Sequence, residues 1–192
     1  MDLFKHLAYK RSAMNAHGLH SPLVYDLYMD ILAEKKEFYS FSLINQLSAK
    51  NEDFQIKEAQ LLYQLLNKYG LKKGLILGPG KESLKTVMES ITSEMDIQFE
   101  YQEDTVYDFI HFTTECSASD INKTPLKSNL STIEFISLSH PHKHMEQQEL
   151  WKELTSNNTV SVTIDLWSIG ICFPNKKQIK QHFILQNKHF QY

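Results

Sequence analysis

The stretch Leu75–Ser83 constrains the fold of this chain more than any other segment. It reads Leu-Ile-Leu-Gly-Pro-Gly-Lys-Glu-Ser: a short apolar run, a Gly-Pro-Gly turn, and the start of a segment with helical spacing. A buried strand that passes through a glycine turn into a helix is the first half of a βαβ unit. In such a unit the turn and the helix N-terminus can hold a ligand. A plain tight turn has the same pattern, so both interpretations stay open here.

Helical and strand patterns alternate along the rest of the chain. We expect helices over 55–69 and 145–154, and strands over 97–101, 107–112, 132–138, 160–166 and 181–185, with 169–173 continuing the fourth of these after a corner. This order predicts an α/β fold with a mostly parallel sheet. It further predicts that the strands around Val162 and Phe183 pair as a C-terminal antiparallel hairpin.

Composition and charge limit the classes of function. The net charge of −3 and the pI near 6.3 give no global basic field that would indicate nucleic acid or an anionic membrane. Cys116 and Cys172 lie far apart, which favours neither a disulfide framework nor a zinc knuckle. No apolar run approaches the roughly 20 residues of a membrane span, and the first residues lack a signal-peptide core. We therefore expect a cytoplasmic protein.

An acidic residue follows the glycine turn at the spacing found in nucleotide-binding βαβ units. Glu100 ends the strand candidate 97–101, about twenty residues beyond Gly80. In nucleotide-binding βαβ units an acid in this place accepts hydrogen bonds from ribose hydroxyls. The pattern thus gives Gly78, Gly80 and Glu100 as candidate cofactor-binding residues. The alternative is that Glu100 is a solvent-exposed charge at the end of a strand.

The N-terminal region, residues 1–50, is expected to form a helical appendage on a sheet domain that spans 51–192. Ser21 and Pro22 are a typical helix start, with Ser21 as N-cap. His17 and His20 lie in the turn before it, without a carboxylate or thiolate at ligand spacing. We expect these two histidines to be anchored by hydrogen bonds and not by a metal.

Two stretches of the chain carry a resemblance to a known family. One is His17–Leu27, HGLHSPLVYDL, and the other is Val160–Phe173, VSVTIDLWSIGICF, followed by KQHF at 180–183. In these stretches the chain resembles a bacterial family of class I S-adenosyl-L-methionine (SAM) dependent methyltransferases. The resemblance implies a Rossmann-like three-layer sandwich, SAM as cofactor, and a methyl acceptor that is an unidentified small molecule or protein.

The chain departs from that family where the chemistry would lie. Glu82 stands where the family has a later glycine of the SAM loop, and Thr113 replaces a strand-end aspartate. Ser139 and His140 stand in place of paired aspartates, while His142 matches the family's histidine. Mg²⁺ prefers carboxylate oxygens, which these positions lack, so these departures argue against the metal-dependent version of this chemistry.

The loop His140–His144 contains three alternating histidines. A zinc or nickel site and a plain polar loop before a helix are both compatible with this pattern. Two functions remain. The first is a SAM-dependent methyltransferase-like protein with weakened or lost activity, in which His142 would act as the catalytic base for a hydroxyl acceptor. The second is a non-catalytic interaction or ligand-sensing module on the same fold.

Overall fold

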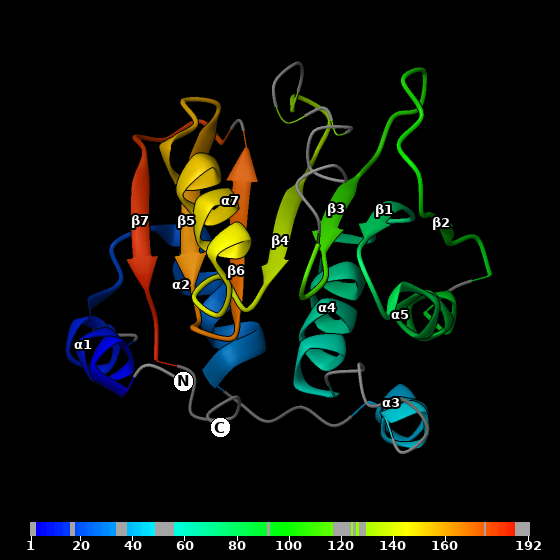
Figure 1. Cartoon of the computed structure of the whole chain (residues 1–192), viewed down its shortest axis with the longest axis horizontal. Helices are drawn as coiled ribbons and strands as arrows, with labels where there is room; N and C mark the ends of the chain where they lie inside the picture. Colours follow the sequence, from blue (N-terminus) through cyan, green and yellow to red (C-terminus); the bar gives the residue numbers. More distant parts are fainter. Residues whose placement is uncertain are drawn as a thin grey trace.

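The computed structural model describes residues 3–15, 18–33, 38–48, 56–91, 93–116, 124, 126, 130–174 and 176–186. Within them one seven-stranded sheet has the order β2-β1-β3-β4-β6-β5-β7 (Figure 1). Its strands are β1 (Lys73–Leu77), β2 (Asp96–Gln98), β3 (Phe109–Phe112), β4 (Phe135–Ser139), β5 (Val160–Asp165), β6 (Ile169–Pro174) and β7 (Gln181–Ile184). Only β6 runs against its neighbours. The chain therefore has an α/β fold with a mostly parallel sheet, consistent with a Rossmann-like arrangement.

The C-terminal pairing differs from the one expected from the sequence. The antiparallel hairpin joins β5 to β6 through the Trp167 corner, with Ile164 opposite Ile171. The strand around Phe183 pairs with β5 in parallel, with Ile164 opposite Phe183. The expected antiparallel pair of the Val162 and Phe183 strands is therefore wrong. The physical reason is the tight corner at Trp167. It reverses the chain directly after β5, so that β6 is the antiparallel neighbour of β5. A second reversal after β6 then brings β7 beside β5 in the parallel direction.

Helices cover both faces of the sheet. The helices are α1 (Leu3–Ser12), α2 (Pro22–Leu27), the π-helix η2 (Tyr28–Ala33), α3 (Ser40–Ser48), α4 (Ile56–Tyr69), α5 (Lys81–Glu89) and α7 (Met145–Ser156). Buried side chains of α2, η2, α4 and α5 pack on one face. Those of α7 pack on the other, and α7 lies in front of the sheet in the view of Figure 1. None of the described helices is long and apolar enough to cross a membrane.

The N-terminal segment contains the helices α1, α2, η2 and α3 and shares the main core. Val24 and Leu27 of α2 are fully buried in the same cluster as sheet residues such as Ile164. Helix α2 begins at Pro22 as expected, but the Ser21 hydroxyl does not cap it and instead contacts Gln178 Oε1 at 3.3 Å. The backbone of Met14 pairs with that of Ile184 and Gln186, so the segment after α1 covers part of the outer edge of β7.

The two N-terminal histidines were expected to be anchored by hydrogen bonds. His20 is exposed, and its ring has no hydrogen-bonding partner among the described residues, so this expectation is wrong for His20. The exposed ring can be solvated by water, so it needs no protein partner. His17 lies outside the described residues.

Candidate functional site

The carboxyl ends of the parallel strands meet at one edge of the sheet, the lower edge in Figure 1. We call this the carboxyl edge. Gly78 follows β1, Thr113 follows β3 and His142 follows β4, while Asp165 ends β5. This is the edge at which open α/β sheets bind ligands. It has two distinct parts, because β1 and β5 are four strand spacings apart, roughly 19 Å.

The glycine turn after β1 adopts the backbone conformation that the sequence predicts. Gly78 has φ 102° and Gly80 has φ 74°, both in the left-handed region that favours glycine. Gly80 is the N-cap of α5, and no side chain caps that helix end. The prediction of a strand, glycine turn and helix is therefore confirmed as local structure.

The space beside Gly78 is filled by protein. A Cβ placed on Gly78 would lie 2.2 Å from Thr113 Oγ1. The Thr113 side chain is buried, its hydroxyl has no hydrogen-bonding partner among the described residues, and its backbone N–H donates to Leu77 O at 2.9 Å. Gly78 thus allows close packing of Thr113.

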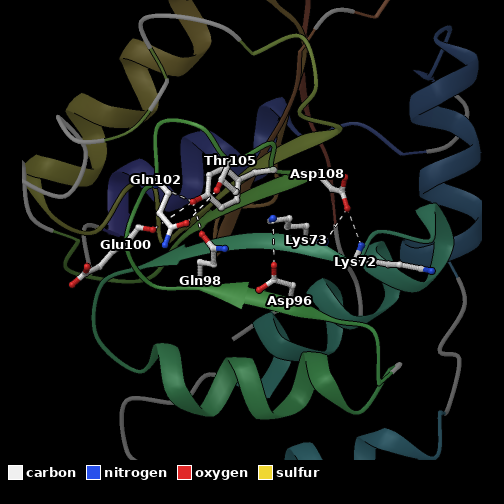
Figure 2. Close-up of polar contacts among 9 residues, drawn as sticks. Lys72, Lys73, Asp96, Gln98, Glu100, Gln102, Thr105 and Asp108 are labelled. Atoms are coloured by element: carbon white, nitrogen blue, oxygen red, sulfur yellow. Dashed lines mark hydrogen bonds and ion pairs between the residues drawn. The ribbon is translucent and has the colours of Figure 1, made fainter.

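No contact between the Glu100 side chain and this turn is seen among the described residues; the Glu100 backbone carbonyl lies 3.4 Å from the Tyr107 hydroxyl. Glu100 lies two residues beyond the end of β2 and is exposed. The neighbouring contacts are made by Tyr107, whose hydroxyl donates to Gln98 Oε1 at 2.7 Å and accepts from the backbone N–H of Gln102 at 3.0 Å. Figure 2 shows Glu100 at the outside of this network, with its carboxylate pointing away from it.

Taken together, the residues around the glycine turn fit SAM poorly. The helix N-terminus and the two left-handed glycines are present, but Thr113 occupies the Cβ side of Gly78. Glu82, exposed in the first turn of α5, places a negative charge near the position that would face a carboxylate of the ligand.

The second part of the carboxyl edge contains a hydrogen-bonded pair of side chains, His142 and Asp165. His142 Nε2 lies 2.7 Å from Asp165 Oδ2. The other carboxylate oxygen, Oδ1, accepts a hydrogen bond from the backbone N–H of Trp167 at 2.8 Å. The Asp165 side chain is 4% exposed, and the His142 side chain 27%. A buried carboxylate that holds one imidazole nitrogen leaves the other nitrogen, Nδ1, to accept a proton from a ligand.

Aromatic rings surround this pair. The Trp167 ring stacks on His142 with a centroid distance of 4.8 Å and an angle of 23°, and His6 meets Trp167 edge-on at 4.7 Å. From α1, the Tyr9 hydroxyl donates to Leu185 O at 2.7 Å. Burial, and then the charge of Asp165, raise the pKa of Tyr9. Tyr9 is therefore a fixed neutral donor and not a candidate base.

The backbone is strained around the same pair. Trp167 has φ 68° and His140 has φ 47°, both unusual for residues with a side chain. Such strain persists only where the surrounding structure enforces it, and it concentrates at functional sites. In Trp167 the strained backbone presents the N–H that holds Asp165.

His140 provides a test of the electrostatics of this edge. Burial lowers the pKa of His140, Lys143 and His144 lower it further, and Glu58 opposes them. The folded chain therefore binds this proton less readily than the unfolded chain, whose histidine titrates near pH ~6.5. The His140 contribution to stability is full above that pH and is lost as the pH falls toward the lowered pKa.

We expect the wild-type free energy of unfolding to decrease between neutral and mildly acidic pH, and the His140→Asn variant to decrease less steeply. Asparagine tolerates the positive φ at this position and does not titrate. Urea unfolding at several pH values measures both slopes. The exposed His20→Asn control should keep the wild-type slope, and a His140→Asn variant with that same slope would contradict the assignment.

One polar cluster at this edge was not predicted from the sequence. His111, fully buried on β3, lies with Nε2 2.8 Å from Glu58 Oε1 on α4 and with Nδ1 2.9 Å from Ser137 Oγ on β4. Ser139 Oγ also donates to Glu58. The Ser-His-Glu order suggests a hydrolase triad, but Ser137 is fully buried and no substrate could reach its hydroxyl. We interpret the cluster as structural.

The histidines of the loop after β4 have different partners. His142 pairs with Asp165, while His144 Nε2 lies 3.4 Å from the exposed Glu115. Among the described residues, no group of three His, Cys, Asp or Glu side chains is arranged to hold a metal ion.

Comparisons with known proteins add no assignment to this geometry. No protein-family model matches the chain, and no curated protein is similar enough to count as a match.

Proposed function

We propose that this chain is a SAM-dependent methyltransferase-like protein in which cofactor binding is weak and methyl transfer is weakened or lost. The observation that carries the proposal is the contact of Thr113 with Gly78, which fills the side of the turn that a ligand would approach. The negative charge of the exposed Glu82 and the outward orientation of the Glu100 carboxylate would also weaken SAM binding. The acceptor side, with His142 and Asp165, keeps an ordered hydrogen-bonding site.

The fold supports this relationship at the level of topology. The sheet has the order β2-β1-β3-β4-β6-β5-β7 and is parallel except for β6, which agrees with the mostly parallel Rossmann-like plan that the resemblance implies. The family resemblance of residues 17–27 and 160–173 agrees with that arrangement. A shared fold does not by itself assign an activity.

The alternative is a non-catalytic interaction or ligand-sensing module. The crowding of Gly78 by Thr113 favours this alternative, because a protein that binds no methyl donor does not require an accessible Gly78. A methylated product formed from SAM, however slowly, would rule out the non-catalytic alternative.

The role of Glu82 can be tested by substitution. We expect Glu82→Gly to bind SAM more tightly than the wild type, because the change removes a negative charge and restores close backbone approach. Calorimetric titration of SAM measures the change. Glu82→Gln separates the charge from the backbone effect, and Glu103→Gln, at an exposed residue outside the turn, is the control. An unchanged affinity in Glu82→Gly would refute the role given to Glu82.

A further inference from the structure

We infer that helix α1 is a detachable lid over the Asp165 end of the carboxyl edge, and that the present conformation is the closed one. In Figure 1, α1 lies at the lower end of β7, beside that edge. When the lid opens, it uncovers the aromatic ring of Trp167 and the backbone carbonyl groups that α1 contacts. The inference goes beyond the proposed function, because it concerns access to this part of the edge and does not depend on SAM binding at the glycine turn.

The side chains of His6 and Tyr9 hold α1 against the sheet. The Tyr9 hydroxyl donates to Leu185 O at 2.7 Å and lies 3.3 Å from Asp165 O. The centroid of the Tyr9 ring lies 5.2 Å from that of Trp167, and the His6 ring meets Trp167 edge-on at 4.7 Å. These contacts place α1 over the corner that joins β5 to β6.

The rest of α1 contributes little to the hydrophobic core. None of its described side chains belongs to either cluster of buried residues, whereas α2 and α4 both place fully buried side chains in the main core. Six other side chains of the helix are exposed: Phe4, Leu7, Ala8, Lys10, Arg11 and Ser12. Since the burial of apolar surface is the main stabilising term in folding, α1 is held to the sheet more weakly than α2 or α4.

One polar atom of α1 disfavours the closed conformation. His6 Nδ1 is buried and has no hydrogen-bonding partner among the described residues. This nitrogen loses its hydration when α1 closes and regains it when α1 opens, so its burial destabilises the closed state. The hydrogen bond of the Tyr9 hydroxyl stabilises the closed state. The two side chains therefore act on the position of the lid in opposite directions.

The chain directly after α1 provides a fixed point about which the helix can detach. The backbone N–H of Met14 donates to Ile184 O at 2.8 Å, and Met14 O accepts from the N–H of Gln186 at 3.0 Å. These bonds use no residue of α1, so they remain when the helix leaves the sheet. A helix of 10 residues is marginal in water by itself, so the detached α1 unfolds and exposes its amides to exchange.

Hydrogen–deuterium exchange, read by mass spectrometry on the full chain, measures the opening. In the wild type, the amides of α1 should exchange faster than those of β5 and β6, through local opening of the lid. Tyr9→Phe removes the hydroxyl and should raise the exchange rate of α1 about fivefold. His6→Phe keeps a ring against Trp167 but removes the unpartnered nitrogen, and should lower that rate about threefold. The matched control Tyr25→Phe, at an exposed tyrosine of α2, should leave the rate unchanged.

Fluorine NMR of the chain labelled with 5-fluorotryptophan provides a second readout. A soluble paramagnetic reagent should broaden the Trp167 resonance more in Tyr9→Phe than in the wild type, and should broaden that of the buried Trp151 equally in both.

Three exchange results would each overturn the inference. The first is a wild type in which α1 exchanges as slowly as β5. The second is an unchanged α1 rate in Tyr9→Phe. The third is a Tyr9→Phe variant in which β5 and β6 accelerate as much as α1, because the change then destabilises the whole fold. Faster exchange of α1 in His6→Phe would overturn the role of His6 Nδ1. Failure of SAM binding would affect none of these outcomes.

Discussion

Replacing His111 by alanine is expected to lower the free energy of unfolding by about 3–5 kcal/mol. His111 is fully buried and lies 2.8 Å from Glu58, so its removal takes away a partner of a carboxylate that is 7% exposed, while the Ser139 hydroxyl still donates to it. An unpaired buried carboxylate costs more than the volume lost with the ring. Urea unfolding of the two chains measures the difference.

Two further variants make this prediction specific. His20→Ala removes an exposed histidine and should change stability by no more than about 0.5 kcal/mol. The double change Glu58→Leu with His111→Leu removes both polar partners and should recover much of the loss, because apolar replacement of a buried pair is often close to neutral. A small effect of His111→Ala, or a double variant less stable than the single one, would contradict the structural role of the cluster.

Gly78→Ala is expected to lower the free energy of unfolding by about 2–5 kcal/mol, the sum of a strained left-handed backbone and overpacking. The new Cβ would lie 2.2 Å from Thr113 Oγ1, at a backbone φ of 102°. Thermal or urea unfolding measures the loss.

The chain contains a matched control for this second prediction. Gly70 also has a positive φ, 63°, but a Cβ there would meet nothing within 4 Å. Gly70→Ala should therefore show the backbone cost alone, about 1–2 kcal/mol. Adding Thr113→Ala to Gly78→Ala should recover the overpacking part. If Gly78→Ala and Gly70→Ala cost the same, Thr113 does not fill the turn as described.

Much of the fold could be predicted from the sequence, because it depends on local patterns. The apolar run before Gly78 and the helical spacing of 56–69 specify their elements through burial alone. The pairing of β7 with β5 could not be predicted, since parallel and antiparallel neighbours place the same residues of β7 on the core face. The tight reversal at Trp167 depends on a positive φ in a bulky residue, for which the sequence has no marker.

The candidate site was predicted unevenly for a similar reason. His142 was identified from the sequence, whereas its partner Asp165 was not. The two residues are 23 positions apart in the chain, and in the sheet β6 lies between β4, which precedes His142, and β5, which ends at Asp165. The Glu58–His111 contact joins α4 to β3, two elements far apart in the chain, and no sequence pattern indicates it. Gly78 and Gly80 adopt the expected conformation, but the side chain that fills the turn comes from the end of a different strand.

The central claim, a filled and weakened cofactor turn, is tested most directly by calorimetric titration of SAM into the unmodified chain. The account predicts a dissociation constant above ~100 μM, or a binding free energy no more favourable than about −5.5 kcal/mol. At ten times such a constant, SAM would stabilise the chain by only ~1.4 kcal/mol. Low-micromolar binding of SAM would contradict the account.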